Sequence, residues 1–101
     1  MADVIAPVVF GVVDQIRQAV EPVDPDCSLE ETAAAYVITV ANVSPDVYGA
    51  IEDILLGARV RSKTSLNCDE DLLIIRVYFN QDNAGKIARQ DFGNGDRLYF
   101  L

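Results

Sequence analysis

Two segments of the chain carry apolar residues at helical spacing. The first apolar stripe consists of Val9, Val12, Val13, Ile16 and Val20. It predicts an amphipathic helix over residues 6–20, although the many valines leave a strand over residues 8–13 as an alternative. The second segment follows Ser44-Pro45-Asp46. There a hydroxyl N-cap, a proline in the first turn and a carboxylate near the positive end of the helix dipole predict a helix over residues 45–57.

Four further segments have the pattern of β-strands. Residues 36–43 and 72–79 are rich in β-branched and other apolar side chains and predict hydrophobic strands. In residues 59–66 the basic residues Arg59, Arg61 and Lys63 alternate with Val60, Ser62 and Thr64, as in a half-exposed strand. In residues 97–101, Leu98 and Phe100 likewise alternate with Arg97 and Tyr99. The expected face of the sheet away from the helices carries Arg59, Arg61, Lys63, Arg76, Tyr78, Arg97 and Tyr99.

Residues 21–31 are the clearest candidate for a linker. They contain two prolines and five carboxylates, a composition that disfavours the interior of helices and strands. Ser28 and Glu31 have the spacing of a capping box, so a short helical turn over residues 29–34 is expected to follow.

The last quarter of the chain has two interpretations, which decide the order of the elements. Residues 82–92 fit a short helix, and residues 35–101 then have the β-α-β-β-α-β order of the ferredoxin-like split βαβ unit, preceded by the N-terminal helix. Alternatively, residues 86–92 form a strand that turns back at Gly93-Asn94-Gly95, and one helix packs on an antiparallel meander. Both predict the α+β class, with helices on one face of an antiparallel sheet.

Length and composition predict one folded domain over residues 1–101. Half of the residues are apolar, which is too hydrophobic for a disordered chain. About 100 residues is also a usual size for one domain. We expect this domain to consist of the helix over residues 6–20, the acidic linker over residues 21–31 and an α+β core over residues 35–101.

Several features that specific classes of protein need are missing from the sequence. It has no histidine, which excludes Ser-His-Asp and Cys-His catalysis and Cys2His2 zinc sites within one chain. No apolar run reaches the ~18 residues of a membrane span, and the N-terminus lacks a basic secretory flank. We expect a cytoplasmic protein, or one in the host cytoplasm if the source is a virus or phage, with Cys27 and Cys68 as reduced thiols.

No motif indicates an enzyme, a metal site or a cofactor. A calcium loop that starts at Asp24 needs glycine at position 29 and glutamate at position 35, where the chain has Leu29 and Ala35. The adjacent carboxylates of residues 69–71 are typical of a solvated hairpin loop. The sequence therefore predicts no catalytic residues, no bound metal and no cofactor.

The charges are divided unevenly along the chain. The formal net charge is −8, from 16 acidic and 8 basic residues. Residues 1–58 contain ten acidic residues and one basic residue, Arg17, whereas residues 59–101 contain six acidic and seven basic residues. The net negative charge therefore belongs to the first half of the chain.

The acidic half suggests a protein-interaction module that docks on a basic surface of a partner protein. Small acidic inhibitors, including proteins that imitate nucleic acid, act in this way because opposite potentials speed encounter. The expected docking face consists of Glu21, Asp24, Asp26, Glu30, Glu31, Asp46, Glu52 and Asp53.

The basic face of the sheet supports two alternative hypotheses. In one, the chain is a self-associating assembly subunit of a larger complex or virus particle, and the acidic side of one copy meets the basic face of the next. In the other, a ferredoxin-like regulatory domain holds an anionic ligand with Arg61, Lys63 and Arg76. Nucleic acid is not favoured as a partner, because the net negative charge repels a polyanion. Basic side chains on strands also protect sheet edges from aggregation, and this explanation of the basic residues requires no binding partner.

Overall fold

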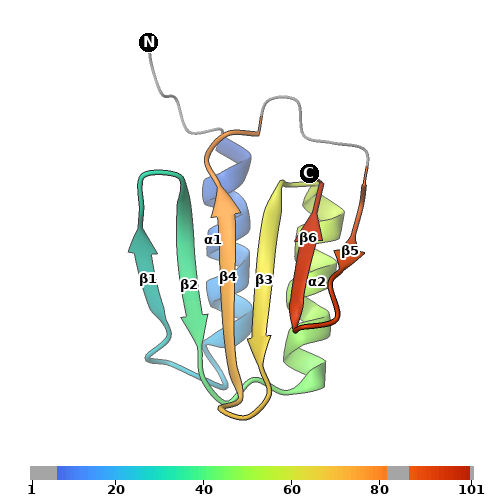
Figure 1. Cartoon of the computed structure of the whole chain (residues 1–101). Helices are drawn as coiled ribbons and strands as arrows, with labels where there is room; N and C mark the ends of the chain where they lie inside the picture. The colour runs from blue at the N-terminus through green and yellow to red at the C-terminus, as the bar shows by residue number, and fades with distance from the viewer. Residues whose placement is uncertain (1–6, 82–86, 101) are drawn as a thin grey trace.

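The computed structural model describes residues 7–81 and 87–100. They form two helices on one face of a six-stranded antiparallel sheet, which confirms the predicted α+β class (Figure 1). In chain order the elements are α1 (Pro7–Val20), β1 (Ser28–Glu31), β2 (Ala35–Val40), α2 (Pro45–Ala58), β3 (Ser62–Asn67), β4 (Leu72–Tyr78), β5 (Gln90–Asp91) and β6 (Asp96–Tyr99).

The strands follow the order β1-β2-β4-β3-β6-β5 across the sheet. Strand β4 lies between β2 and β3, so β2-α2-β3 is a split β-α-β crossover, as the sequence predicted. Figure 1 shows the sheet from its open face, with α1 behind β2 and β4 and α2 behind β3 and β6. The outermost strand β1 extends beyond α1 and is not covered by it.

The core lies between the helices and the central strands. The whole apolar stripe of α1 is buried, which confirms the helix and rules out the alternative strand over residues 8–13. On the sheet side, alternate residues point toward the helices, among them Ile38 of β2 and Ile75 of β4, which lie opposite each other and are fully buried. Neither of the two helices that the structure describes has the length and apolar character to cross a bilayer.

Capping contacts define both ends of α2. Ser44 Oγ accepts a hydrogen bond from the Val47 N–H at 3.3 Å, as predicted for an N-cap. At the other end Arg59 is left-handed, with a φ of 55°, and its N–H donates to carbonyl groups of the last turn. The predicted strand position of Arg59 is therefore wrong, because this residue ends α2 and its guanidinium lies over the Phe100 ring, while β3 begins at Ser62.

The predicted linker contains the edge strand β1. Residues Ser28–Glu31 pair with β2, so the prediction of a helical turn here is wrong. Thr32 gives the physical reason, because its hydroxyl accepts hydrogen bonds from the Ala34 and Ala35 N–H groups and donates to the Ala35 carbonyl. These contacts close a tight hairpin that brings β1 back beside β2.

Strands β5 and β6 form a C-terminal hairpin. Its turn contains Gly93 and Gly95, both with positive φ, and a Cβ on Gly95 would collide with the Leu66 carbonyl oxygen. Gln90–Asp91 is a strand, as the hairpin interpretation predicted for this part of the chain, and the alternative helix over residues 82–92 is wrong in its described part, since residues 87–92 are not helical. The remainder of the ambiguous segment, at residues 82–86, lies outside the described residues.

Candidate interaction surfaces

A cluster of polar side chains joins α2 to the C-terminal hairpin. The Glu52 carboxylate accepts hydrogen bonds from the Arg89 and Arg97 guanidinium groups at 3.1 and 3.0 Å. It also accepts one from the Tyr99 hydroxyl at 2.8 Å. Arg97 forms a further ion pair with Asp91 at 2.9 Å. We call these five residues the Glu52 cluster.

Arg97 and Tyr99 lie on the face opposite to the one predicted from the sequence. Arg97 is paired with Thr64, which is buried and faces the helices, and Tyr99 points the same way two residues later. The hairpin turn fixes this register, since the Leu66 N–H donates to the Gly95 carbonyl at 2.8 Å. A shift of one residue in the pairing moves every side chain of a strand to the other face, so alternation along the sequence does not decide it.

The Glu52 cluster balances its own charges. Burial raises the pKa of the Glu52 carboxyl, but the hydrogen bonds from Tyr99 and Arg89 and the nearby guanidinium charges outweigh it and hold that pKa below its ordinary value of 4.5. Burial, together with the hydrogen bond to Glu52, raises the pKa of the Tyr99 hydroxyl above its ordinary value of 10. At neutral pH the carboxylate stays charged and the phenol stays protonated, so the cluster links α2 to β6 structurally.

The open face of the sheet holds four of the seven residues that the sequence assigned to it, namely Arg61, Lys63, Arg76 and Tyr78. The Arg61 guanidinium lies 4.8 Å from the centroid of the Tyr78 ring, and Lys63 forms a 3.5 Å ion pair with Asp96. The strand pairing places Val37, Thr39, Ser65, Leu72, Ile74 and Leu98 on the same face. The open face is therefore a mixed basic and apolar surface with fewer basic side chains than predicted.

Three loops meet at one end of the molecule, at the bottom of Figure 1. They precede β1, α2 and β4, and hydrogen bonds join them: Asp24 Oδ2 accepts from the Ala41 N–H at 2.8 Å, and the Val43 N–H donates to the Asp71 carbonyl at 3.2 Å. These loops contain no Lys or Arg. With the first turn of α2 they carry Glu21, Asp24, Asp26, Asp46, Asp69, Glu70 and Asp71, which we call the acidic end.

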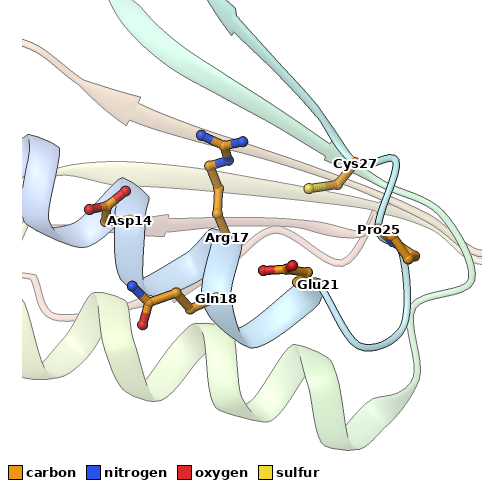
Figure 2. A pocket seen from close by; sticks show the side chains of 6 residues that line it. All are labelled: Asp14, Arg17, Gln18, Glu21, Pro25 and Cys27. Atoms are coloured by element: carbon orange, nitrogen blue, oxygen red, sulfur yellow. The ribbon is translucent and has the colours of Figure 1, made fainter.

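A cleft of about 250 Å³ lies between α1 and the segment that enters β1 (Figure 2). Its lining residues are Asp14, Arg17, Gln18, Glu21, Pro25 and Cys27, and we call it the α1–β1 cleft. In Figure 2 the Arg17 side chain extends from α1 toward the strands, and the Cys27 sulfur points back toward the helix. The sequence did not reveal this site, because its two walls meet only when the chain returns beside α1 as an edge strand.

The structure divides the eight acidic residues of the expected docking face. Four of them lie at the acidic end, while Glu30 and Glu31 are exposed on β1 and Asp53 is exposed on α2. Glu52 is separate from these, since it is bound within its own cluster. Five exposed carboxylates line the α1–β1 cleft, precede β1 or lie on it, and we call them together the acidic surface: Asp14, Glu21, Asp26, Glu30 and Glu31.

The acidic surface has no counterions of its own within the described part of the chain. Every ion pair that the described residues form uses Glu52, Asp91 or Asp96 as the acidic partner. Arg17 carries a positive charge beside the cleft, between Asp14 and Glu21 along α1, and only partly balances the carboxylates. The acidic surface therefore keeps a net negative charge.

Other candidate chemistry adds little to these surfaces. Both cysteines are free thiols, with Cys27 half-buried in the cleft and Cys68 exposed between β3 and β4. Across residues 7–81 and 87–100, no group of three His, Cys, Asp or Glu side chains is placed to hold a metal ion. Comparison with protein-family models, with curated proteins and with solved structures gave no match. Function is therefore inferred from charge and geometry.

Proposed function

We propose that this chain is a small protein-interaction module whose acidic surface docks on a basic surface of a partner protein. The observation that supports this is the contrast in counterions: Arg89 and Arg97 form ion pairs with Glu52 and Asp91, while the carboxylates of the acidic surface lack ion pairs within the described residues. Unpaired like charges repel one another, and a basic partner removes that repulsion. Complementary charge also speeds association and selects among partners.

We assign no catalytic role to the chain. A general base or a nucleophile needs a free reactive group beside the group that activates it. The carboxylate of Glu52 is already occupied by three internal donors. The α1–β1 cleft offers a mixture of carboxylates, one guanidinium and a thiol, which suits the binding of polar groups.

The test uses two graded variants of the acidic surface. In one, Asp26, Glu30 and Glu31 are replaced by Asn, Gln and Gln, which removes charge and keeps shape, and in the other all three are replaced by Lys. Proteins retained by the immobilised wild-type chain from an extract of its source cells are identified, and the partner is purified. We expect its association rate to fall from wild type to the neutral variant and again to the lysine variant, and to fall with added salt. Equal rates for all three proteins would overturn the proposal.

The open face of the sheet favours a second candidate function, self-assembly. This face combines the guanidinium groups of Arg61 and Arg76 with half-buried aliphatic side chains, and the helices leave it uncovered. The acidic end of a second copy has the complementary charge, and such a head-to-tail contact builds rings or filaments. In this case, light scattering at low salt should show a defined oligomer that Arg61→Glu with Arg76→Glu dissolves. A monomer in wild type at low and high salt would exclude assembly by this face.

A further inference from the structure

Strand β1 is an open edge of the sheet. It pairs with β2 on one side and is the first strand in the sheet order, so alternate N–H and C=O groups of its four residues point away from the sheet. The other edge, β5, has only two residues. Among the described strands, β1 therefore presents the longer row of free backbone donors and acceptors, which is what an added strand requires.

The side chains of β1 comprise one apolar residue, one serine and two carboxylates. Glu31 and Leu29 lie on the helix side of β1, opposite Tyr36 and Ile38, whereas Glu30 points to the open face. Leu29 is 39% exposed, because α1 does not reach over β1. A strand placed beside β1 would thus meet one apolar side chain flanked by carboxylates on both faces of the sheet.

One face of α1 continues this pattern along the cleft. Phe10, Asp14 and Arg17 follow one another at spacings of three or four residues and share a side of α1, and Glu21, directly after the helix, continues this line because its N–H donates to the Arg17 carbonyl. Phe10 is 50% exposed and its ring centroid lies 5.7 Å from that of Tyr36, next to β1. Asp14, Arg17 and Glu21 line the cleft, and Phe10 lies one turn before Asp14 on the same side of α1, outside the lining.

We infer that the basic surface of the partner includes an extended segment that pairs with the free edge of β1 and turns alternate side chains toward the helix side of the sheet, beside Leu29. This inference rests on the proposed function and specifies its geometry. Backbone hydrogen bonds to β1 supply affinity that does not depend on sequence, while apolar side chains pack beside Leu29 and Phe10 and Lys or Arg side chains pair with Glu30 and Glu31.

The same residues disfavour a second copy of this chain at the edge. If two β1 strands paired antiparallel, the four glutamates Glu30 and Glu31 from both copies would gather around the axis, and like charges directly opposite one another destabilise a pair of strands. A strand rich in Lys or Arg is attracted by the same charges. The edge is thus protected against self-pairing and open to a basic segment.

The experiment begins with selection of peptides of roughly eight residues, a usual strand length, from a random displayed library on the wild-type chain. We expect the enriched peptides to alternate Lys or Arg with apolar residues, and to bind in fluorescence anisotropy. No enrichment, or enrichment of peptides without basic residues, would overturn the inference. The proposed function would survive that result, because it is tested with the intact partner protein.

Backbone pairing is tested with N-methylated forms of the best peptide. Methyl groups on alternate amides remove the donors on one edge of an extended peptide and leave those on the other edge free. One of the two methylated forms should bind at least about tenfold more weakly than the other, as expected when several backbone hydrogen bonds are lost. Equal binding by both forms would show that the peptide does not pair with β1.

The location is tested with two variants of equal charge change. Glu30→Lys with Glu31→Lys alters β1, and Asp69→Lys with Glu70→Lys alters the exposed loop between β3 and β4 at the acidic end. We expect the β1 variant to weaken peptide binding about tenfold, and the loop variant to change it about twofold at most. Equal weakening by both variants would overturn the assignment to β1 while still supporting an acidic docking surface. No weakening by either would overturn this inference and leave the proposed function to its own test with the intact partner protein.

Discussion

The Glu52 cluster and the acidic surface contain the same kinds of side chain in opposite situations. In the Glu52 cluster each carboxylate faces a guanidinium group within hydrogen-bond or ion-pair distance, and the cluster joins α2 to the C-terminal hairpin. At the acidic surface the carboxylates stand on α1, on a loop and on β1 without such partners in the described residues. Charge in the first region stabilises the fold, whereas charge in the second has no ion-pair partner among the described residues.

This difference follows from the uneven distribution of charge along the chain. Three basic residues of the second half, Lys63, Arg89 and Arg97, pair with acidic residues of the hairpin and of α2, because β6 packs next to β3 beneath that helix. The first half has only Arg17 to balance its carboxylates. Replacing a member of the Glu52 cluster should therefore cost stability, and replacing a member of the acidic surface should cost binding.

Glu52→Ala is expected to have the largest effect on stability. It removes the common acceptor of two guanidinium groups and of the buried Tyr99 hydroxyl. Leaving such donors unpaired lowers the free energy of unfolding by about 2 to 3 kcal/mol. Urea unfolding followed by circular dichroism measures the loss. Asp53→Ala, at the exposed neighbour on α2, is the matched control and should change it by less than about 0.5 kcal/mol. Similar losses in both variants would contradict the comparison.

Lowering the pH should reduce the free energy of unfolding of wild type more than that of the Glu52→Gln variant. The pKa of Glu52 in the folded protein is lower than its ordinary value of 4.5. Its charge therefore contributes stability that is complete above the unfolded-state pKa and is lost as the pH falls through the folded-state pKa. Unfolding free energies measured from about pH 7 to about pH 3 should converge for the two proteins at the acid end. Protonation of the other carboxylates relieves their repulsion equally in both proteins. If the free energies of unfolding of the two proteins changed in parallel with pH, the charge of Glu52 would make no pH-dependent contribution to stability.

Asp24→Ala is expected to have an intermediate effect, although Asp24 belongs to the acidic end. Its carboxylate accepts the Ala41 N–H hydrogen bond at 2.8 Å and so holds two loops together. Loss of this contact should lower the free energy of unfolding by about 1 kcal/mol. Asp26→Ala, two residues later and exposed, should leave it unchanged within about 0.5 kcal/mol. The same urea series measures both, and a larger loss for Asp26→Ala would reverse these assignments.

Glu30→Lys with Glu31→Lys should have the smallest effect on stability. Both side chains are exposed on β1 and form no ion pair with another described residue. The free energy of unfolding should stay within about 0.5 kcal/mol of wild type, even though binding of a basic partner falls. A loss as large as that of Glu52→Ala would mean that these glutamates stabilise the hairpin, and would remove the distinction between the two regions.

Local signals in the sequence were sufficient for the helices and for the class of fold. The valine stripe of α1 and the Ser44-Pro45-Asp46 start of α2 both act through neighbours along the chain, and both predictions are confirmed. The face of β4 that points to the helices was also readable, because a strand next to a core alternates with period two. Of the candidate sites, the sequence identified the exposed acidic character of residues 21–31 and the basic character of Arg61, Lys63 and Arg76.

The features that only the tertiary structure decided depend on pairing between segments that are distant in the sequence. The register of β6 on β3 turned Arg97 and Tyr99 toward Glu52, and the hairpin closed by Thr32 made an acidic linker into the edge strand β1. No local pattern determines these outcomes, since a shift of one residue exchanges the two faces of a strand and a short acidic segment has no strong preference of its own. The sequence thus determined which charges exist and which elements carry them. Strand pairing decided which of those charges form ion pairs within the chain and which remain at an open edge.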